Sequence, residues 1–162
     1  MVNPDRFHDK SLILDLIYPL NTASLLPLKV LVVDDDRDTA ELLKFILEPN
    51  DLEVTIANTG EEGIEKARME NPDVMIVDLH MPDMDGLRVC QKVRQFSALP
   101  ILVLSAVNKK NIVIEALNCG ADDFLIKPVK HEVLIASVNK LARRARAEQK
   151  AQQVNGDSAN HD

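Results

Sequence analysis

From residue 29 onward, short apolar runs alternate with segments in which apolar residues recur at helical spacing. The runs are rich in Val, Ile and Leu, which is typical of strands buried on both faces. The strands predicted in this way are Lys29–Val33, Leu52–Ile56, Val74–Val77, Ile101–Leu104 and Phe124–Ile126. The helices predicted between and after them are Thr39–Glu48, Thr59–Glu70, Leu87–Phe96, Ile112–Asn118 and His131–Arg146. This alternation predicts an α/β fold with a parallel sheet covered by helices on both faces.

Local signals support several of the predicted helix ends. Thr59 followed by Glu62 forms a capping box, which opens a helix. Gly120 follows Ile112–Asn118 and is typical of a helix end. Asp36 is interpreted as an acidic residue that complements the dipole of the first helix.

The same pattern divides the 162 residues into three parts. Residues 1–28 carry Pro4, Pro19 and Pro27 and one short apolar patch, and are interpreted as an N-terminal extension. Three interpretations of this extension stay open: a docking helix around residues 11–18, a disordered arm, or an upstream-start artefact. Residues 29–146 form the predicted domain. Residues 147–162 are polar, lack a core-forming pattern, and are predicted to form a frayed or disordered tail.

Composition and charge exclude several classes of partner. The chain is 46% hydrophobic and 28% charged, as in globular proteins, and its net charge of −7 argues against nucleic acid as the main partner. The basic segment Arg143–Lys150 lacks aromatic neighbours, so direct DNA binding is not expected. No apolar run reaches the roughly 18 residues of a membrane span, and Asp15 interrupts Leu12–Leu20, the one candidate targeting segment. Cys90 and Cys119 cannot build a disulfide framework and are interpreted as small buried hydrophobes. A cytoplasmic protein is expected.

Polar residues that can carry chemistry follow the predicted strands. Asp34–Asp36 follow the first strand, Asp78 the third, Ser105 the fourth and Lys127–Pro128 the fifth. Ligands of such sheets bind beyond the carboxyl ends of the strands, so these groups are expected to converge there. Clustered carboxylates repel one another and need a cation, and ligation by oxygen alone suits Mg²⁺. Asp78 is then the candidate nucleophile for an acyl phosphate, while Lys127 and Ser105 can bind phosphoryl oxygens.

Four motifs together resemble the receiver domain of two-component response regulators, a CheY-like domain. They are Val30–Asp36 (VLVVDDD), Asp73–Gly86 (DVMIVDLHMPDMDG), Ile101–Ala106 (ILVLSA) and Gly120–Pro128 (GADDFLIKP). The resemblance covers about residues 29–146, with the motifs in the order and spacing of the family. It implies a flavodoxin-like (βα)₅ doubly wound sheet with strand order 2-1-3-4-5.

The resemblance also implies roles for the matched residues. Asp78 would be the phosphoacceptor, and Asp34, Asp35 and Asp78 would hold Mg²⁺ together with the backbone carbonyl of His80. The phosphate-binding and switch residues would be Ser105, Lys127 and Phe124, although Phe124 lacks the hydroxyl that many receivers carry at this position. The Lys127–Pro128 bond is expected to be cis. Two rim positions are expected to tune the dephosphorylation rate, namely His80 and Val107.

Partners are implied in the same way. A sensor histidine kinase or a phosphotransfer protein would supply the phosphoryl group. The face formed by the last two helices and the fifth strand resembles the charged dimer surface of OmpR/PhoB-type receivers. A homodimer would use Glu115, Asp122, Asp123, Lys140, Arg143 and Arg144. The alternative interpretation of these charges is a solvated helix face, in which exposed pairs contribute little.

The predicted function is therefore a phosphoacceptor rather than an enzyme, which at most assists its own phosphorylation and dephosphorylation. No output domain is recognised, so the chain is expected to be a phosphorelay intermediate, a stand-alone receiver or a shortened OmpR-type transcriptional regulator. A flavin-binding domain would need hydroxyls and amides after the first strand, where this chain has carboxylates. A phosphatase with an aspartyl nucleophile would use a DxD pattern, which Asp34–Asp36 formally offers. Asp78, Ser105 and Lys127 argue against it.

Overall fold

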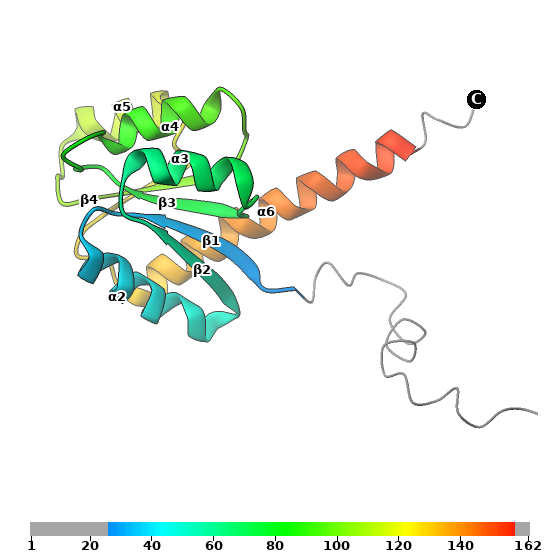
Figure 1. The fold of residues 1–162 in the computed structure, drawn as a ribbon, viewed down its shortest axis with the longest axis horizontal. Helices are drawn as coiled ribbons and strands as arrows, with labels where there is room; N and C mark the ends of the chain where they lie inside the picture. The colour runs from blue at the N-terminus through cyan, green and yellow to red at the C-terminus, as the bar shows by residue number, and fades with distance from the viewer. Residues whose placement is uncertain (1–25, 158–162) are drawn as a thin grey trace, which may run out of the picture.

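The computed structural model describes residues 26–157, which form a parallel sheet between two layers of helices (Figure 1). Within this range the sheet has five strands in the order β2-β1-β3-β4-β5, and every neighbouring pair is parallel. The predicted flavodoxin-like topology is confirmed. The strands are β1 (Leu28–Val33), β2 (Leu52–Ala57), β3 (Val74–Asp78), β4 (Ile101–Ser105) and β5 (Asp123–Ile126).

The helices divide between the two faces of the sheet. In Figure 1, α2 and α6 lie on one face, and α3, α4 and α5 lie on the other. Their bounds are α2 (Arg37–Leu47), the short 3₁₀ helix η3 (Glu48–Asn50), α3 (Gly60–Met69), α4 (Gly86–Arg94), α5 (Lys110–Asn118) and α6 (His131–Asp157). Each face therefore encloses its own hydrophobic core.

Strand β1 is almost continuously apolar because both of its faces are buried. Successive side chains point to opposite faces, so Val30 and Val32 belong to the core under α2 and α6. Leu31 and Val33 belong to the core under α3 and α4. Gly63 allows α3 to approach this strand, because a Cβ at that position would lie 2.6 Å from Cγ2 of Val33.

Side-chain caps fix the starts of α2 and α3. The start of α3 after Thr59 is confirmed, whereas α2 begins at Arg37, two residues before the predicted Thr39. The Asp36 carboxylate accepts hydrogen bonds from the backbone N–H of Asp38 and Thr39, which stabilises the first turn of α2. Thr59 Oγ1 accepts from the Glu62 backbone N–H at 3.1 Å. Glu62 Oε2 in turn accepts from the backbone N–H of Asn58 at 2.9 Å, one residue earlier than in the usual capping box. This hydrogen bond lowers the pKa of Glu62.

The last helix corrects the prediction, because α6 does not end at Arg146 but continues to Asp157. Figure 1 shows this extension projecting beyond the sheet, on the side where the strands begin. The hydrophobic pattern fades after Ala145, but the following residues are mostly Ala, Glu, Gln and Lys, which favour helix without a core contact. The predicted division of the chain into three parts stays a prediction, and residues 11–18 lie outside the described residues.

A buried ion pair holds α6 to the edge of the sheet where the strands begin. Asp73, 7% exposed, accepts from Nε and Nη2 of Arg146 at 3.0 and 2.8 Å and from the Lys29 backbone N–H at 2.8 Å. Arg146 also donates to the backbone carbonyls of Leu26 and Pro27, at 2.8 and 2.7 Å. One arginine thus joins the last helix, the start of β3 and the chain that leads into β1.

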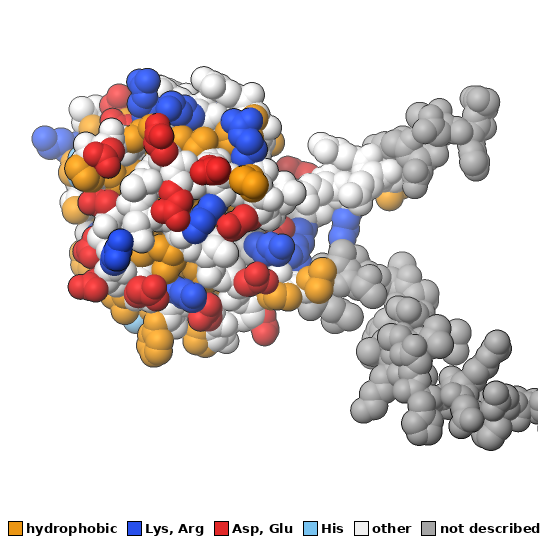
Figure 2. Space-filling view, in the orientation of Figure 1, with side chains coloured by type: hydrophobic (Ala, Val, Ile, Leu, Met, Phe, Trp, Pro, Cys, Tyr) orange, Lys and Arg blue, Asp and Glu red, His pale blue; other side chains and the backbone are white. Residues whose placement is uncertain are grey.

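The distribution of surface charges and the burial of Cys90 agree with the interpretation of the composition. Figure 2 shows acidic and basic side chains intermixed over the face in view, without a broad region of one sign. Cys90 is buried, and burial raises the pKa of its thiol to about 12, so it acts as a small hydrophobe as predicted. Cys119 is only half-buried. Among the described helices, none combines the length and the apolar character required to cross a membrane.

Candidate functional site

Three carboxylates meet at the edge of the sheet where the strands end. Asp34 and Asp35 follow β1, and Asp78 is the last residue of the neighbouring strand β3. One carboxylate oxygen from each lies within 4.8 Å of the others. Asp34 is buried, with 3% of its surface exposed, Asp78 is half-buried and Asp35 is exposed. The pairing of Val33 with Val77 produces this meeting, because it brings the next residue of each strand to the same level.

Lys127 reaches into this cluster from the end of β5. Its Nζ donates to Asp78 Oδ1 at 2.8 Å and lies 3.5 Å from Asp34 Oδ2. The Lys127 backbone N–H donates to the carbonyl of Ser105 at 2.8 Å, so the lysine is fixed to the end of β4. The peptide bond between Lys127 and Pro128 is cis.

The electrostatics of the cluster favour a further cation. Burial raises the pKa of Asp34, against the lowering effect of the Asp36 backbone N–H at 3.0 Å and of Lys127. Burial also opposes the charge on Lys127, but the hydrogen bond and the charge of Asp78 outweigh it and raise the pKa of the ammonium. One ammonium cannot balance three carboxylates. An all-oxygen donor set with this excess of negative charge fits a hard divalent ion such as Mg²⁺.

Asp36 does not belong to the cluster, because its carboxylate caps α2 and also accepts from Thr39 Oγ1 at 2.8 Å. The DxD arrangement of a phosphatase is therefore not formed by the described side chains. Sequence reasoning missed Asn58, whose Nδ2 donates to the backbone carbonyl of Asp34 at 3.1 Å. Its position directly after β2 was the only available signal.

The other sequence-predicted residues lie on strands β4 and β5 and on the loops that follow β3 and β4. Ser105 ends β4 and is fully buried, and its Oγ accepts from the Val107 backbone N–H at 3.0 Å. Phe124 in β5 is half-buried and packs against the core under α3, α4 and α5. His80 is exposed, on the loop between β3 and α4, and Val107 is half-buried on the loop between β4 and α5.

Gly86 is a second residue whose role sequence reasoning missed, since it was named only as the last residue of the motif Asp73–Gly86. The first turn of α4 packs directly against the backbone of the site. A Cβ on Gly86 would lie 2.5 Å from the carbonyl oxygen of Asp78 and 3.1 Å from Cα of Leu79. The Gly86 N–H also donates to the Leu79 carbonyl at 2.9 Å. Only glycine allows this approach, which fixes the backbone that follows Asp78.

Comparison with known proteins places this fold among CheY-like receiver domains. The family model of the response regulator receiver domain matches residues 30–139, more than half of the chain. The chain therefore belongs to the receiver domains of two-component response regulators.

Its relatives are regulators of the same kind. The chain is 39% identical over 128 residues to the response regulator MprA of Mycobacterium leprae (strain TN), and the match covers 78% of this chain and 56% of that protein. It is 37% identical over 118 residues to the alkaline phosphatase synthesis transcriptional regulatory protein PhoP of Bacillus subtilis (strain 168), which covers 72% of this chain and 49% of that protein. The chain thus spans about half the length of the curated relatives it matches.

Solved structures agree. The receiver domain of the Francisella response regulator 1452 is 38% identical, with a TM-score of 0.69, and the match covers 72% of this chain and 97% of that one. A CheY-like receiver domain protein from Methanospirillum hungatei JF-1 is 28% identical, with a TM-score of 0.71, and the match covers 75% and 98%. The expected family and topology are confirmed.

Proposed function

We propose that this receiver domain is a phosphorylation-dependent switch whose phosphoacceptor is Asp78. The observation that carries the proposal is the position of the Asp78 carboxylate, which is half-buried, accepts from Lys127 Nζ and lies beside the two carboxylates that follow β1. A phosphoryl group is negatively charged, as this cluster is, so its transfer to Asp78 requires positive charge nearby. Such a group therefore needs Lys127 on one side and a cation held by Asp34 and Asp35 on the other.

The chemistry is the transfer of a phosphoryl group from a donor molecule to the Asp78 carboxylate. Lys127 holds Asp78 Oδ1, so Oδ2 is the candidate nucleophile. A new O–P bond forms to the incoming phosphorus, while the bond from phosphorus to the donor breaks and the donor keeps the electron pair. Hydrolysis by water later returns the carboxylate and releases phosphate. The protein is a signalling component that carries the phosphoryl group rather than an enzyme that turns over a separate substrate.

The residues that would hold Mg²⁺ are the three cluster aspartates and the backbone carbonyl of His80. Asp34 is fixed for this role by the backbone N–H of Asp36 and by Asn58. When bound, Mg²⁺ supplies the positive charge that offsets the carboxylates and the phosphoryl oxygens. Asp35 is exposed and faces solvent, which leaves this side of the cluster open to an incoming ion.

The switch needs a change in contacts large enough to move an equilibrium. A shift from 1:99 to 99:1 requires about 5.5 kcal/mol of differential stabilisation. Each charge-assisted hydrogen bond to a phosphoryl oxygen contributes about 1.5–3 kcal/mol, so two or three suffice. Lys127 is already in place for one. Ser105 supplies another when its hydroxyl turns to the phosphoryl group, and Phe124 then moves inward.

Two exposed apolar surfaces suit the partners that such a switch needs. Leu42 and Phe45 on α2, 55% and 77% exposed, lie on the helix that follows Asp34 and Asp35, where a histidine kinase or phosphotransfer protein would bind. Ile114 and Leu117 are exposed on α5, and we propose the surface formed by α5, β5 and α6 as the output surface. Phosphorylation would promote a partner complex or homodimer there, with charged contacts from Glu115, Asp122, Asp123, Lys140, Arg143 and Arg144.

Acetyl phosphate with Mg²⁺ tests the phosphoacceptor. Wild-type protein is expected to gain the mass of one phosphoryl group, and Asp78→Asn is expected to gain none, because an amide is not a competent nucleophile. Intact-protein mass spectrometry measures the gain, and size-exclusion chromatography of the same samples detects dimer formation. Asp83→Asn, an exposed aspartate on the adjacent loop, is the matched control and should be phosphorylated as the wild type is. Phosphate on Asp78→Asn would contradict the proposal.

The rim residues are expected to set how long the phosphoryl group lasts. His80 and Val107 lie on the two loops that border Asp78, where they control the approach of water. Exchange of either side chain should change the phosphoryl lifetime several-fold without preventing phosphorylation. The decay of the phosphorylated mass after removal of acetyl phosphate gives the lifetime. An unchanged lifetime in both variants would show that neither residue acts on the attacking water.

A further inference from the structure

A groove lies between η3 and α6, at the edge of the sheet where the strands begin. It has a volume of about 1120 Å³, and its described lining includes Leu26, Pro49, Asn139, Arg143, Ala147 and Lys150. The chain that leads into β1 forms one wall, and Arg146 fixes this wall to α6 through the carbonyls of Leu26 and Pro27. Residues 1–25 therefore join the domain at this groove, which we call the α6 groove.

One side of α6 forms another wall of the α6 groove. Arg143, Ala147, Lys150 and Val154 recur at intervals of three or four residues, which places them on the same side of the helix. The first three line the groove, and Val154, which is 67% exposed, continues this side beyond it. Cationic and apolar side chains thus alternate along this side of the helix.

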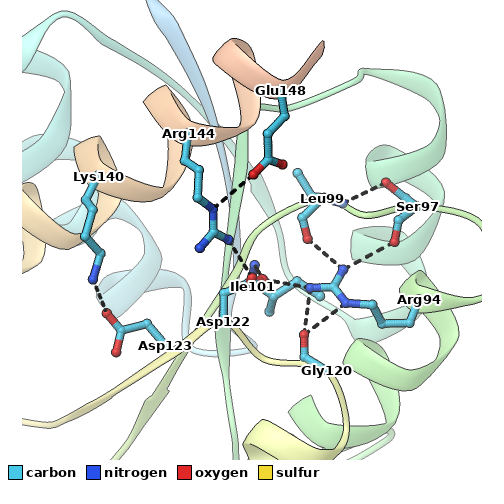
Figure 3. Close-up of polar contacts among 10 residues, drawn as sticks. All are labelled: Arg94, Ser97, Leu99, Ile101, Gly120, Asp122, Asp123, Lys140, Arg144 and Glu148. Carbon is cyan, nitrogen blue, oxygen red and sulfur yellow. Dashed lines mark hydrogen bonds and ion pairs between the residues drawn. The ribbon is translucent and has the colours of Figure 1, made fainter. Parts of the chain in front are cut away.

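Positive charge is in excess in the α6 groove. Among the described residues that line it three are basic, and Asp51 is the one acid. One of the three, Arg146, already belongs to the buried ion pair described above. Figure 3 shows that Lys140 and Arg144, on the neighbouring side of α6, also have acidic partners. Within the described part of the chain no ion pair or side-chain hydrogen bond is formed by Arg143, so the groove holds a cation that lacks a described partner.

The chain itself contains a stretch with the matching chemistry, residues 12–20. Every residue in this stretch except Asp15 is apolar or aromatic, and such side chains favour burial. The stretch ends six positions before Leu26, a separation of at most about 20 Å. A segment tethered this closely reaches an effective concentration on the order of millimolar, so even weak contacts hold it in place.

We propose that residues 12–20 bind in the α6 groove, with Asp15 paired with Arg143 and the apolar side chains against Ala147 and Val154. The occupant of the groove is therefore a segment of the same chain. It joins the part of α6 that projects from the domain to the chain that leads into β1. The contact is independent of the proposed phosphorylation of Asp78.

Tyr18 provides a natural probe for this contact. It lies in the stretch and is the one tyrosine of a chain that contains no tryptophan, so its fluorescence reports on the stretch alone. In the full chain we expect acrylamide to quench Tyr18 with a rate constant about threefold or more below that of a synthetic peptide of residues 1–25, because the contact must open before the quencher reaches the ring. Equal rate constants in the protein and the peptide would overturn the proposal.

Ala147→Glu tests the groove as the place of binding. Ala147 is exposed and lines the groove, and glutamate keeps the helix while adding bulk and negative charge there. The quenching rate constant of Tyr18 should rise to nearly that of the peptide. Ala136→Glu is the matched control, the same change at an exposed position of α6 about 17 Å away, and should leave the rate constant unchanged. Shielding of Tyr18 that persists in Ala147→Glu would rule out this groove.

Charge reversal tests the pair of Asp15 and Arg143. Arg143→Glu and Asp15→Arg should each raise the quenching rate constant of Tyr18 about twofold, because like charges then face one another. The double variant restores opposite charges and should return the rate constant to the wild-type value. A double variant that is quenched as strongly as the single variants would contradict the pair.

A second copy of the chain is the other possible source of the bound stretch. An intramolecular contact does not depend on protein concentration, so the shielding of Tyr18 should stay constant over about a hundredfold dilution. Size-exclusion chromatography at the same concentrations gives the oligomeric state. Loss of shielding on dilution would show that the groove is filled by the stretch of another copy, and would overturn the proposal of a contact within one chain.

Discussion

Replacement of Asp73 by alanine is expected to lower the free energy of unfolding by about 2–3 kcal/mol, because it removes a buried carboxylate that accepts charge-assisted hydrogen bonds. Asp73 accepts hydrogen bonds from Arg146 through both carboxylate oxygens and from the Lys29 backbone N–H. The substitution would therefore remove all these hydrogen bonds at once, while Arg146 keeps its contacts to the backbone carbonyls of Leu26 and Pro27. Urea unfolding followed by circular dichroism measures the change. The slope of the unfolding free energy against urea concentration should stay unaltered if only stability is affected.

Asp123→Ala is the matched control for this prediction. Asp123 also pairs with a basic residue of α6, but its partner Lys140 is 67% exposed and the separation is 3.3 Å. Exposed pairs contribute about 0–1 kcal/mol, so the control should unfold close to the wild type. Equal losses in the two variants would mean that burial of the Asp73 pair does not determine its contribution.

Gly86→Ala is expected to impair both stability and phosphorylation. The added Cβ would lie 2.5 Å from the Asp78 carbonyl oxygen, which is backbone and cannot rotate away as a side chain does. Overpacking of this kind costs about 1–3 kcal/mol. Relief of the clash also displaces the backbone of Asp78 and Leu79, so we expect phosphorylation by acetyl phosphate to slow about tenfold or more, since small misplacements of reacting groups have large effects. Thermal unfolding and the rate of mass gain measure the two effects.

Gly60→Ala separates the local clash from the general effect of replacing a helical glycine. A Cβ on Gly60 would meet side chains, with Val89 Cγ2 at 3.0 Å and Met84 Cβ at 3.1 Å, and no backbone atom among its nearest neighbours. Alanine favours helix over glycine by about 1 kcal/mol, which offsets part of this tighter packing. We expect stability within about 1 kcal/mol of the wild type and an unchanged phosphorylation rate. A slowed rate here would indicate that Gly86→Ala acts through helix packing rather than through Asp78.

Much of the site was predictable from sequence because its residues follow strands. An apolar run reveals a strand, and the residue after it lies at the carboxyl edge of a parallel sheet, so Asp34, Asp78 and Lys127 were expected to meet before their distances were known. The order of the strands was not predictable from periodicity and came from the resemblance of the motifs. The strand ends themselves agree within a residue or two, as at β1, which begins at Leu28 rather than Lys29.

The contacts that hold the opposite edge of the sheet were not predictable in the same way. Asp73 and Arg146 are separated by 73 positions, and neither lies in a pattern that selects its partner from the other charged residues. In the sequence, Arg94 is an ordinary basic residue in the last turn of a helix. Its hydrogen bonds to backbone carbonyls such as that of Leu99 follow from no sequence pattern. The end of α6 was misjudged for a different reason. Hydrophobic periodicity reports core contact, and the extension is helical without one.

The part of α6 beyond Arg146 turns a small rotation of the helix into a displacement of its far end. At 1.5 Å per residue, the 27 residues of α6 measure about 40 Å from end to end. The part beyond Arg146 measures about 17 Å, so a tilt of about 10° there would carry the far end through roughly 3 Å. Arg146 sits where the helix leaves the domain and fixes the angle at which it does so. A fluorophore near residue 154 would therefore report angular changes of the domain as distances.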